Sequence, residues 1–361
     1  MLQHPQAVPA PPTAKRPRVT NSLDTHVNNI SPSRIAVERH ARRAWTAALA
    51  ALYLALPGLA FGEAWPSKPI KIIVNFPPGG AADQIARSLT QPLQEALGQP
   101  VVVENKSGAG GNIGGEAVAK APPDGYTLLM SSGGMVSVNP HIYPKMSFDP
   151  TKDLVPVAAA ARVLVFLVTS PSFPARDATE FLAQLRAKPG KLSFGSPGNG
   201  SSPHLAAEMM KSQAKVFATH VPYRGAAPAL NDLLAGQLDF LFDPGVAIPH
   251  IKVGKVKLLA VGSMKRSPLF PDVPTLNDVG LKGFDADTVF GLYAPAGTPT
   301  DIVNRLNREI NQVLALAGPR ERIAALGGEP APMTTAQFHS KALEDSRRFG
   351  RLIQERKIVG D

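Results

Sequence analysis

The chain has 361 residues, of which 44% are hydrophobic and 18% are charged, and it contains no cysteine. This composition is typical of a globular protein with room for two domains, and it excludes disulfide bonds and thiolate metal sites. The formal net charge is +10, but no arginine-rich helix or basic run interleaved with aromatic residues occurs, so we expect no nucleic-acid partner.

The N-terminal part of the chain has the features of a leader. Residues 1–33 are rich in Pro, Asn, Ser and Thr and lack an apolar period, so we interpret them as disordered or as a spurious extension. Residues 34–64 contain a basic segment, an apolar run of eleven residues at 46–56, and small residues near the end. This order predicts a signal peptide and a mature chain that begins near Trp65. An N-terminal anchor helix is the alternative, although so short a run is a poor match to the thickness of a bilayer.

A glycine turn between a strand and a helix opens the predicted mature chain. The apolar, β-branched run at 70–74 predicts a strand that is buried in a parallel sheet. Two prolines and two glycines at 77–80 end it, and helical spacing begins at Ala81 with Asp83 in the first turn. Such a junction presents free N–H groups and the positive end of a helix dipole at the sheet edge, where α/β folds bind anions. The alternative is a loop in which the glycines only turn the corner.

A second glycine-rich run, at 106–115, is close to a dinucleotide fingerprint but does not match it. Ile113 occupies the position of the third glycine, and no acidic residue follows in a strand about twenty positions later. We therefore discount NAD binding. The next predicted strand, at 126–130, leads into a Ser-Ser-Gly-Gly loop at 131–134, whose hydroxyls can bind a ligand oxygen or cap a helix.

Strand and helix patterns continue to alternate in the second half of the chain, which predicts parallel βαβ units. Residues 162–169 form the most apolar predicted strand and could cross between two domains, and residues 284–295 predict the return crossing. Between them, segments at 196–204 and 219–228 again make the transition from a strand into a helix. His204, in the first turn of its helix, could bind a ligand, cap the helix or lie at the surface.

The sequence lacks the common signatures of catalysis and metal binding. No nucleophile elbow, His-Glu-x-x-His motif or phosphate-binding loop occurs, and the histidines of the predicted mature chain lack metal-ligand spacing. An acid/base pair that assembles only in space stays open. Loops of Gly, Ser and Asn before helix N-termini can hold a carboxylate without performing chemistry on it. The pattern therefore favours binding over catalysis, and we expect no metal and no cofactor.

Several motifs of the predicted mature chain occur in an order that is typical of one receptor family. They are Phe-Pro-Pro-Gly-Gly at 76–80, Gly-Ala-Gly-Gly-Asn-Ile-Gly at 108–114, Gly-Asn-Gly-Ser-Ser-Pro-His-Leu at 198–205 and His-Val-Pro-Tyr at 220–223. With these motifs, residues 65–361 resemble the Bug receptors, the extracytoplasmic solute receptors of tripartite tricarboxylate transporters. The resemblance implies an α/β fold of the type II periplasmic binding protein class, two α/β lobes with a ligand cleft between them. The implied lobes are residues 65–165 plus 291–361, and residues 166–290.

The resemblance also implies a function. A periplasmic receptor, not an enzyme, would capture a small carboxylate by flytrap closure: a di- or tricarboxylate, an amino-dicarboxylate or an aromatic acid. The implied partners are the permease subunits of a tripartite tricarboxylate transporter or a sensor kinase, and we expect a monomer. The predicted ligand-binding residues lie in loops that follow strands: Phe76, Pro78, Gly79, Gly80, Ala81, Asp83, Ser131, Ser132, Gly133, Ser196, Asn199, Gly200, Ser201, Ser202, His204, Tyr223, Gly225, Ala226 and Asp243.

Three departures from the family pattern bear on the identity of the ligand rather than on the fold. Ala81 and Ala82 lack the hydroxyls often found after the glycine pair. Pro244 stands where asparagine is usual, and Val289 stands where tryptophan is common.

Two other functions stay open. An exported enzyme acting on small carboxylic acids could use the same fold, with Asp83, His204 and Asp243 as the candidate acid/base residues. A cytoplasmic regulator could share the pair of lobes, but the sequence has no helix-turn-helix pattern, and the signal sequence argues against that location.

Overall fold

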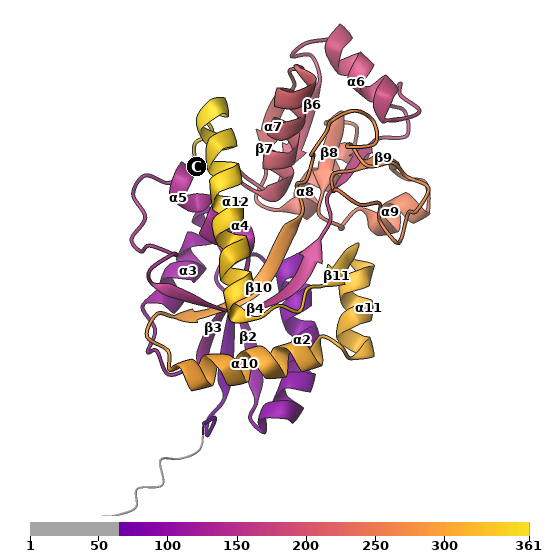
Figure 1. Ribbon diagram of the computed structural model, residues 1–361. Helices are drawn as coiled ribbons and strands as arrows, with labels where there is room; N and C mark the ends of the chain where they lie inside the picture. The colour runs from indigo at the N-terminus through magenta and orange to yellow at the C-terminus, as the bar shows by residue number, and fades with distance from the viewer. Residues whose placement is uncertain (1–64, 361) are drawn as a thin grey trace, which may run out of the picture. The chain divides into compact units, whose positions relative to one another are not determined.

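Two β-sheets, each flanked by helices, make up the described chain (Figure 1). The computed structural model describes residues 65–360; the predicted extension at 1–33 and the predicted signal peptide at 34–64 lie outside this part. The strand order is β11-β4-β10-β3-β1-β2 in the first sheet and β7-β6-β8-β5-β9 in the second. Within residues 65–360, no helix is long and apolar enough to span a bilayer.

The first sheet is parallel at one edge and antiparallel at the other. Its strands are β1 (Ile70–Val74), β2 (Val101–Asn105), β3 (Thr127–Ser132), β4 (Leu154–Val163), β10 (Thr288–Pro295) and β11 (Gly328–Pro330). β1 pairs in parallel with β2 and β3, as its apolar, β-branched sequence predicted, and β10 runs antiparallel to β3 and β4. The carboxyl ends of β1 and β3 therefore meet at one edge of the sheet.

The helices that accompany this sheet follow its strands along the chain. They are α2 (Ala81–Leu97), the short 3₁₀-helix η1 (Ala109–Gly111), α3 (Asn112–Ala119), α4 (Gly133–Ser137), α5 (Asn139–Ile142), α10 (Thr300–Val313) and α11 (Ala317–Ala325). α2 buries Ile85, Leu89 and Leu93, which recur every four residues and so share one face. This apolar face packs into the hydrophobic core of the first sheet.

The second sheet repeats the alternation of strands and helices. Its strands are β5 (Phe166–Thr169), β6 (Ser193–Ser196), β7 (Thr219–Pro222), β8 (Phe240–Asp243) and β9 (Lys257–Val261). Its helices are α6 (Ala178–Ala187), α7 (Ser202–Ala214), α8 (Ala226–Leu234) and α9 (Ile248–Lys252). β6 pairs in parallel with β7 and β8, so the turns that lead into α7 and α8 lie at the same sheet edge.

The apolar run predicted as one strand at 162–169 is two strands in two sheets. β4 ends and β5 begins on either side of Leu164 and Val165, which are 5% and 0% exposed. Because the crossing segment is as buried as the strands, hydrophobicity does not reveal the break. The return connection runs alongside: Gly262 donates its N–H to Val165 O at 2.8 Å and accepts the N–H of Ala286 at 2.9 Å.

The C-terminal helix α12 (Thr335–Arg356) packs against both sets of elements (Figure 1). Phe338 and Ala342 in its first half belong to a core cluster of the first sheet. Phe349 and Ile353 in its second half join the cluster that holds the α6 and α7 side of the second sheet. α12 therefore contributes to a hydrophobic core on each of the two sheets. The lobe boundaries implied by the resemblance stay a prediction.

Candidate functional site

A buried carboxylate holds the turn between β1 and α2. Asp83, the third residue of α2, is 3% exposed, and its Oδ2 accepts the N–H of Gly79 at 2.9 Å. Arg87 Nε and Asn105 Nδ2 each donate to its Oδ1 at 3.0 Å. The Asn105 amide also donates to Phe76 O at 3.0 Å. Asp83 therefore shapes the turn with both of its carboxylate oxygens.

Asp83 is ionised in this setting. Burial opposes its charge, but hydrogen bonds from Arg87, the backbone and Asn105 outweigh that effect, so its pKa lies below the ordinary value of 3.8. Gly79 has a left-handed φ of 82°, which glycine tolerates. Gly80 is the N-cap residue of α2 and provides no side-chain cap. The first N–H groups of this 17-residue helix thus lack intrahelical partners and lie at its positive end.

The end of β3 is anchored to the same turn. The segment at 131–134, predicted as a loop, is instead the last two residues of β3 followed directly by α4. Asn75, which directly follows β1, donates from Nδ2 to Ser131 Oγ at 2.9 Å and to Gly111 O at 3.2 Å. Ser131 donates to Ser132 O at 2.9 Å, and Ser132 is the N-cap residue of α4 without a side-chain cap bond. Sequence reasoning missed Asn75, for which a polar residue at the end of a buried strand was the available signal.

The glycine-rich run at 106–115 has a packing role. A Cβ built on Gly114 would lie 2.7 Å from both Asn75 Cβ and Lys106 O, and one built on Gly111 would lie 2.4 Å from Asn75 Nδ2. Because glycine has no Cβ, η1 and α3 can approach the end of β1 closely. This packing accounts for these glycines without a nucleotide.

In the second sheet, hydroxyls close the turn between β6 and α7. Ser196 Oγ lies 2.7 Å from His220 Nε2 and accepts the N–H of Gly198 at 3.2 Å. Ser201 Oγ donates to Gly198 O at 2.7 Å. Ser201 is the N-cap residue of α7 but makes no side-chain cap bond. The half-buried Ser202 opens the helix.

His204 is turned towards the protein backbone. It is the third residue of α7 and is 5% exposed, and its Nδ1 accepts the N–H of Gly200 at 3.0 Å. Its ring stacks on His220, with the ring centroids 4.0 Å apart. Burial, followed by the neighbouring His220 and Lys211, lowers the pKa of His204 to about 3. His204 is therefore neutral at physiological pH.

The turn between β7 and α8 is built on Tyr223. Its N–H donates to Ser196 O at 2.9 Å, and its hydroxyl donates to Asp232 Oδ2 at 2.6 Å. Burial and this carboxylate raise the pKa of Tyr223 to about 12. Gly225, with a φ of 131°, is the N-cap residue of α8, and Ala226 begins the helix. The hydroxyl of Tyr223 thus bonds to a residue of α8, and no side chain caps the first N–H groups of that helix.

Asp243 lies at the carboxyl end of β8. Its Oδ1 accepts the N–H groups of Gly245 and Ala247, both at 2.8 Å, whereas its Oδ2 has no hydrogen-bond partner within residues 65–360. Burial raises the pKa of Asp243 to about 6. A Cβ built on Gly245 would lie 2.1 Å from Leu326 O. The unusual Pro244-Gly245 sequence therefore fits a close approach of two backbones.

Contacts between the turns bring most of the predicted residues together. The bond from Asn75 to Ser131 joins the first two turns. A Cβ built on Gly134 would lie 3.9 Å from Gly200 O, which places the start of α4 beside the turn before α7. A Cβ built on Gly198 would lie 3.5 Å from Tyr223 O, which adds the turn before α8. Turns of both sheets thus form one chain of contacts, and Asn199 and Gly133 lie within it.

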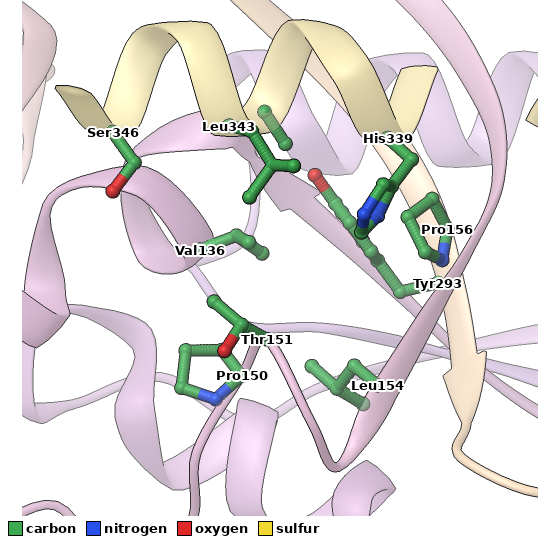
Figure 2. A pocket seen from close by; sticks show the side chains of 10 residues that line it. Val136, Pro150, Thr151, Leu154, Pro156, Tyr293, His339, Leu343 and Ser346 are labelled. Carbon is green, nitrogen blue, oxygen red and sulfur yellow. The ribbon is translucent and has the colours of Figure 1, made fainter. Parts of the chain in front are cut away.

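A small cavity elsewhere does not contain the predicted residues. It lies beneath α12, where Tyr293, His339 and Leu343 line it (Figure 2), and its volume of about 20 Å³ accommodates one water-sized group. Burial raises the pKa of Tyr293, and its hydroxyl has no partner within residues 65–360. Across the same residues, no group of three or more His, Asp or Glu side chains is arranged to hold a metal ion.

The family of the chain follows from its comparison with known proteins. A family model described as "Tripartite tricarboxylate transporter family receptor" matches residues 85–358. The chain belongs to this receptor family. The BugT protein of Bordetella pertussis is 37% identical over 314 residues, which cover 85% of this chain and 96% of BugT. A protein from the tcbD-tcbE intergenic region of Pseudomonas sp. strain P51 is 41% identical over 298 residues, or 82% of this chain and 88% of that protein.

Solved structures of similar receptors share the fold. BugD, a periplasmic binding protein, is 34% identical with a TM-score of 0.75 and covers 82% of this chain and 99% of its own. An R. palustris protein solved with adipate is 32% identical with a TM-score of 0.78, at the same coverage of 82% and 99%. MatC from Rhodopseudomonas palustris, solved with bound malate, is 34% identical with a TM-score of 0.74 and covers 80% and 100%. They confirm the predicted type II periplasmic binding protein fold with two α/β lobes.

Proposed function

We propose that this receptor binds a small dicarboxylate in the periplasm between the turns that precede α2, α4, α7 and α8. The observation that carries this proposal is the chain of contacts that brings those turns together across two sheets. Two relatives with the same fold were solved with dicarboxylates, adipate and malate. The proposed ligand residues are those predicted from the sequence except Asp83 and His204. These two residues, together with Asn75, which the sequence did not predict, support the turns rather than contact the ligand.

The start of α2 supplies donors for one carboxylate. Ala81 and Ala82 are 8% and 2% exposed, and the first N–H groups of a helix have no carbonyl partner within it. A bound carboxylate would accept these bonds and lie at the positive end of the helix dipole. Each such charge-assisted bond contributes about 1.5–3 kcal/mol.

The starts of α7 and α8 supply donors from the second sheet. Ser202 offers its N–H and hydroxyl, and Ala226 offers its N–H after Gly225. A ligand that contacts both sheets binds the closed arrangement of the lobes better than an open one, and so shifts the population towards closure. We expect the closed receptor to deliver its ligand to permease subunits of a tripartite transporter or to a sensor kinase.

A binding role is better supported than an enzymatic one. Of the three candidate acid/base residues, Asp83 is engaged by Gly79, Arg87 and Asn105. His204 accepts a backbone N–H, and no hydrogen bond links any two of the three within residues 65–360. General acid–base catalysis needs groups within hydrogen-bond reach of one reacting atom. We therefore expect capture and release without turnover.

Thermal unfolding of the exported protein tests the proposal. The chain would be expressed with residues 1–64, purified from the periplasm and sequenced at its N-terminus, which we expect near Trp65. Malate, adipate, citrate, glutamate and benzoate would then be titrated, and a Tm that rises with ligand concentration indicates binding to the folded state. A protein that stays in the cytoplasm, or a Tm that no carboxylate raises, would contradict the proposal.

A charge substitution tests the site itself. Ser202→Asp places a carboxylate in the first turn of α7, where it favours the helix but repels a ligand carboxylate. Thr300→Asp makes the same change in the first turn of α10 and serves as the control. We expect Ser202→Asp to abolish the Tm shift with malate or adipate and Thr300→Asp to retain it. Equal binding by both variants would exclude α7 from the site.

A further inference from the structure

We propose that His204 is a positioning residue, whose neutral Nδ1 fixes Gly200 and thereby the turn before α7 against the opposite lobe. The proposal rests on the ligand site proposed above. It assigns His204 no contact with the ligand, although the sequence allowed one. Its Nδ1 accepts the Gly200 N–H at 3.0 Å, and its side chain is buried between elements of the second sheet.

Through Gly200, the turn before α7 contacts α5 and the residue before it. Gly200 has a left-handed φ of 74°, and a Cβ built on it would lie 2.3 Å from Ile142 Cδ1 and 3.2 Å from Val138 Cγ1. Its carbonyl oxygen faces Gly134 at the start of α4. A displacement of Gly200 would therefore alter the turn before α7 and its contact with α5 together.

Stacked aromatic rings fix the orientation of His204. The His204 and His220 rings are nearly parallel, at 11°, with centroids 4.0 Å apart. Phe194 stacks on His220 from β6 with a centroid distance of 4.8 Å. His220 in turn lies 2.7 Å from Ser196 Oγ, at the beginning of the same turn. The ring of His204 thus has little freedom to rotate away from Gly200.

The charges around His204 keep it neutral. Because Nδ1 accepts a bond, the proton lies on Nε2, which is 4.0 Å from Glu208 Oε1. Glu208 already pairs with Lys211 and, at 3.0 Å, with Arg356 Nε, so its carboxylate does not draw a third positive charge. Lys211 and His220 oppose protonation further. The acceptor at Nδ1 is therefore retained across the physiological pH range.

Two isosteric replacements separate the acceptor from the bulk of the ring. In His204→Asn, the amide oxygen can occupy the place of Nδ1 and accept the Gly200 N–H. In His204→Gln, the amide group reaches the place of Nε2 instead. We expect the Asn variant to restore affinity for malate or adipate to within about threefold of wild type, and the Gln variant to lose about tenfold, because one hydrogen bond is lost.

Hydrogen exchange of the Gly200 amide supplies a readout that needs no ligand. Measured relative to the α7 amides of the same variant, so that a general loss of stability cancels, exchange should stay slow in wild type and His204→Asn and become fast in His204→Gln. Equal protection of Gly200 in the Gln and Asn variants would overturn the proposal. If neither malate nor adipate binds wild type while the exchange pattern holds, the proposed ligand is wrong and the positioning role stands.

If the exchange pattern holds and the Gln variant binds as tightly as wild type, then Gly200 is fixed by His204 but does not position the ligand site. That outcome also overturns the proposal.

Discussion

The turns before α2 and α7 share one hydrogen-bond arrangement but use different acceptor groups. In each, the third residue of the helix accepts the N–H of the glycine four positions earlier. Asp83 Oδ2 accepts from Gly79 at 2.9 Å, and His204 Nδ1 accepts from Gly200 at 3.0 Å. Each acceptor is buried, and each glycine has a left-handed φ. One acceptor is a carboxylate and the other a neutral imidazole.

This difference changes what each helix start can offer an anion. The charge of Asp83 is partly offset by Arg87 but still lies at the positive end of α2. His204 carries no charge, so it leaves the dipole of α7 available. The side chain of the third helix residue thus shapes the turn before each helix. Its charge determines how strongly the helix start attracts an anion. We expect α7 to attract a ligand carboxylate more strongly than α2.

The largest expected effect distinguishes the two glycines. Gly79→Ala meets no atom within 4 Å, so it should cost only the left-handed backbone strain of about 1–2 kcal/mol. Gly200→Ala adds an overlap with Ile142 and should lower the Tm further. Ile142 is buried, so Ile142→Ala lowers the Tm by itself. In that background, Gly200→Ala should lower the Tm less than it does in wild type, whereas the effect of Gly79→Ala should be unchanged. Equal Tm values for the two glycine variants would show that the Ile142 side chain moves aside without a measurable loss of stability.

The next effect is the pH dependence that His204 confers on stability. Its pKa is about 3 in the folded protein against an ordinary 6.5. Below pH 6.5, His204 is therefore protonated in the unfolded chain but stays neutral in the folded protein. The free energy of unfolding then falls by about 1.4 kcal/mol per pH unit. This loss continues towards pH 3. Urea unfolding between pH 7 and 4 should show that the stability of wild type changes with pH more unfavourably than that of His204→Asn, by this amount per pH unit as the pH falls.

Buried carboxylates do not obscure that comparison. Burial raises the pKa of Asp243 and Asp287 to about 6, so each stabilises the folded state as the pH falls. Both are present in wild type and in the variant, and the difference between the two proteins isolates His204. Parallel curves would mean that His204 is not held neutral.

Asp83→Asn should have a smaller effect that appears in another pH window. Because the pKa of Asp83 is below 3.8, its charge stabilises the fold above that value, and the contribution is lost as the pH falls through the lowered pKa. We expect the variant to be about 1.5 kcal/mol less stable at pH 7, the contribution of a charged hydrogen bond. The two Tm values should converge as the pH falls well below 3.8, and a gap that persists there would indicate a steric cause.

The smallest expected effect concerns the hydroxyl at the start of α7. Ser202→Ala should weaken dicarboxylate binding about fivefold, corresponding to about 1 kcal/mol for one hydrogen bond, and leave the Tm of the free protein unchanged. Ser201→Ala is the matched comparison, because the Ser201 hydroxyl donates to Gly198 O within the turn and its loss should lower that Tm. If Ser202→Ala binds as tightly as wild type, the ligand does not contact this hydroxyl.

The sequence by itself determined the fold class and the family, because both depend on local and ordered signals. An apolar β-branched run followed by Pro-Pro-Gly-Gly and a helical period predicts a strand, turn and helix, and β1 and α2 confirm it. The same junction recurs before α7 and α8. Motifs in fixed order along residues 65–361 were sufficient for the resemblance that the family match confirms.

Only the tertiary structure decided how these turns are held. The contacts of Asn75 with Ser131 and of Gly200 with Ile142 join residues that are distant in sequence. No sequence pattern predicts either contact. The break within 162–169 is hidden because the crossing segment is as buried as its strands. The role of His204 depends on which ring nitrogen faces Gly200. Hydrophobic periodicity reports which side of an element is buried, whereas long-range packing decides which polar atoms meet there.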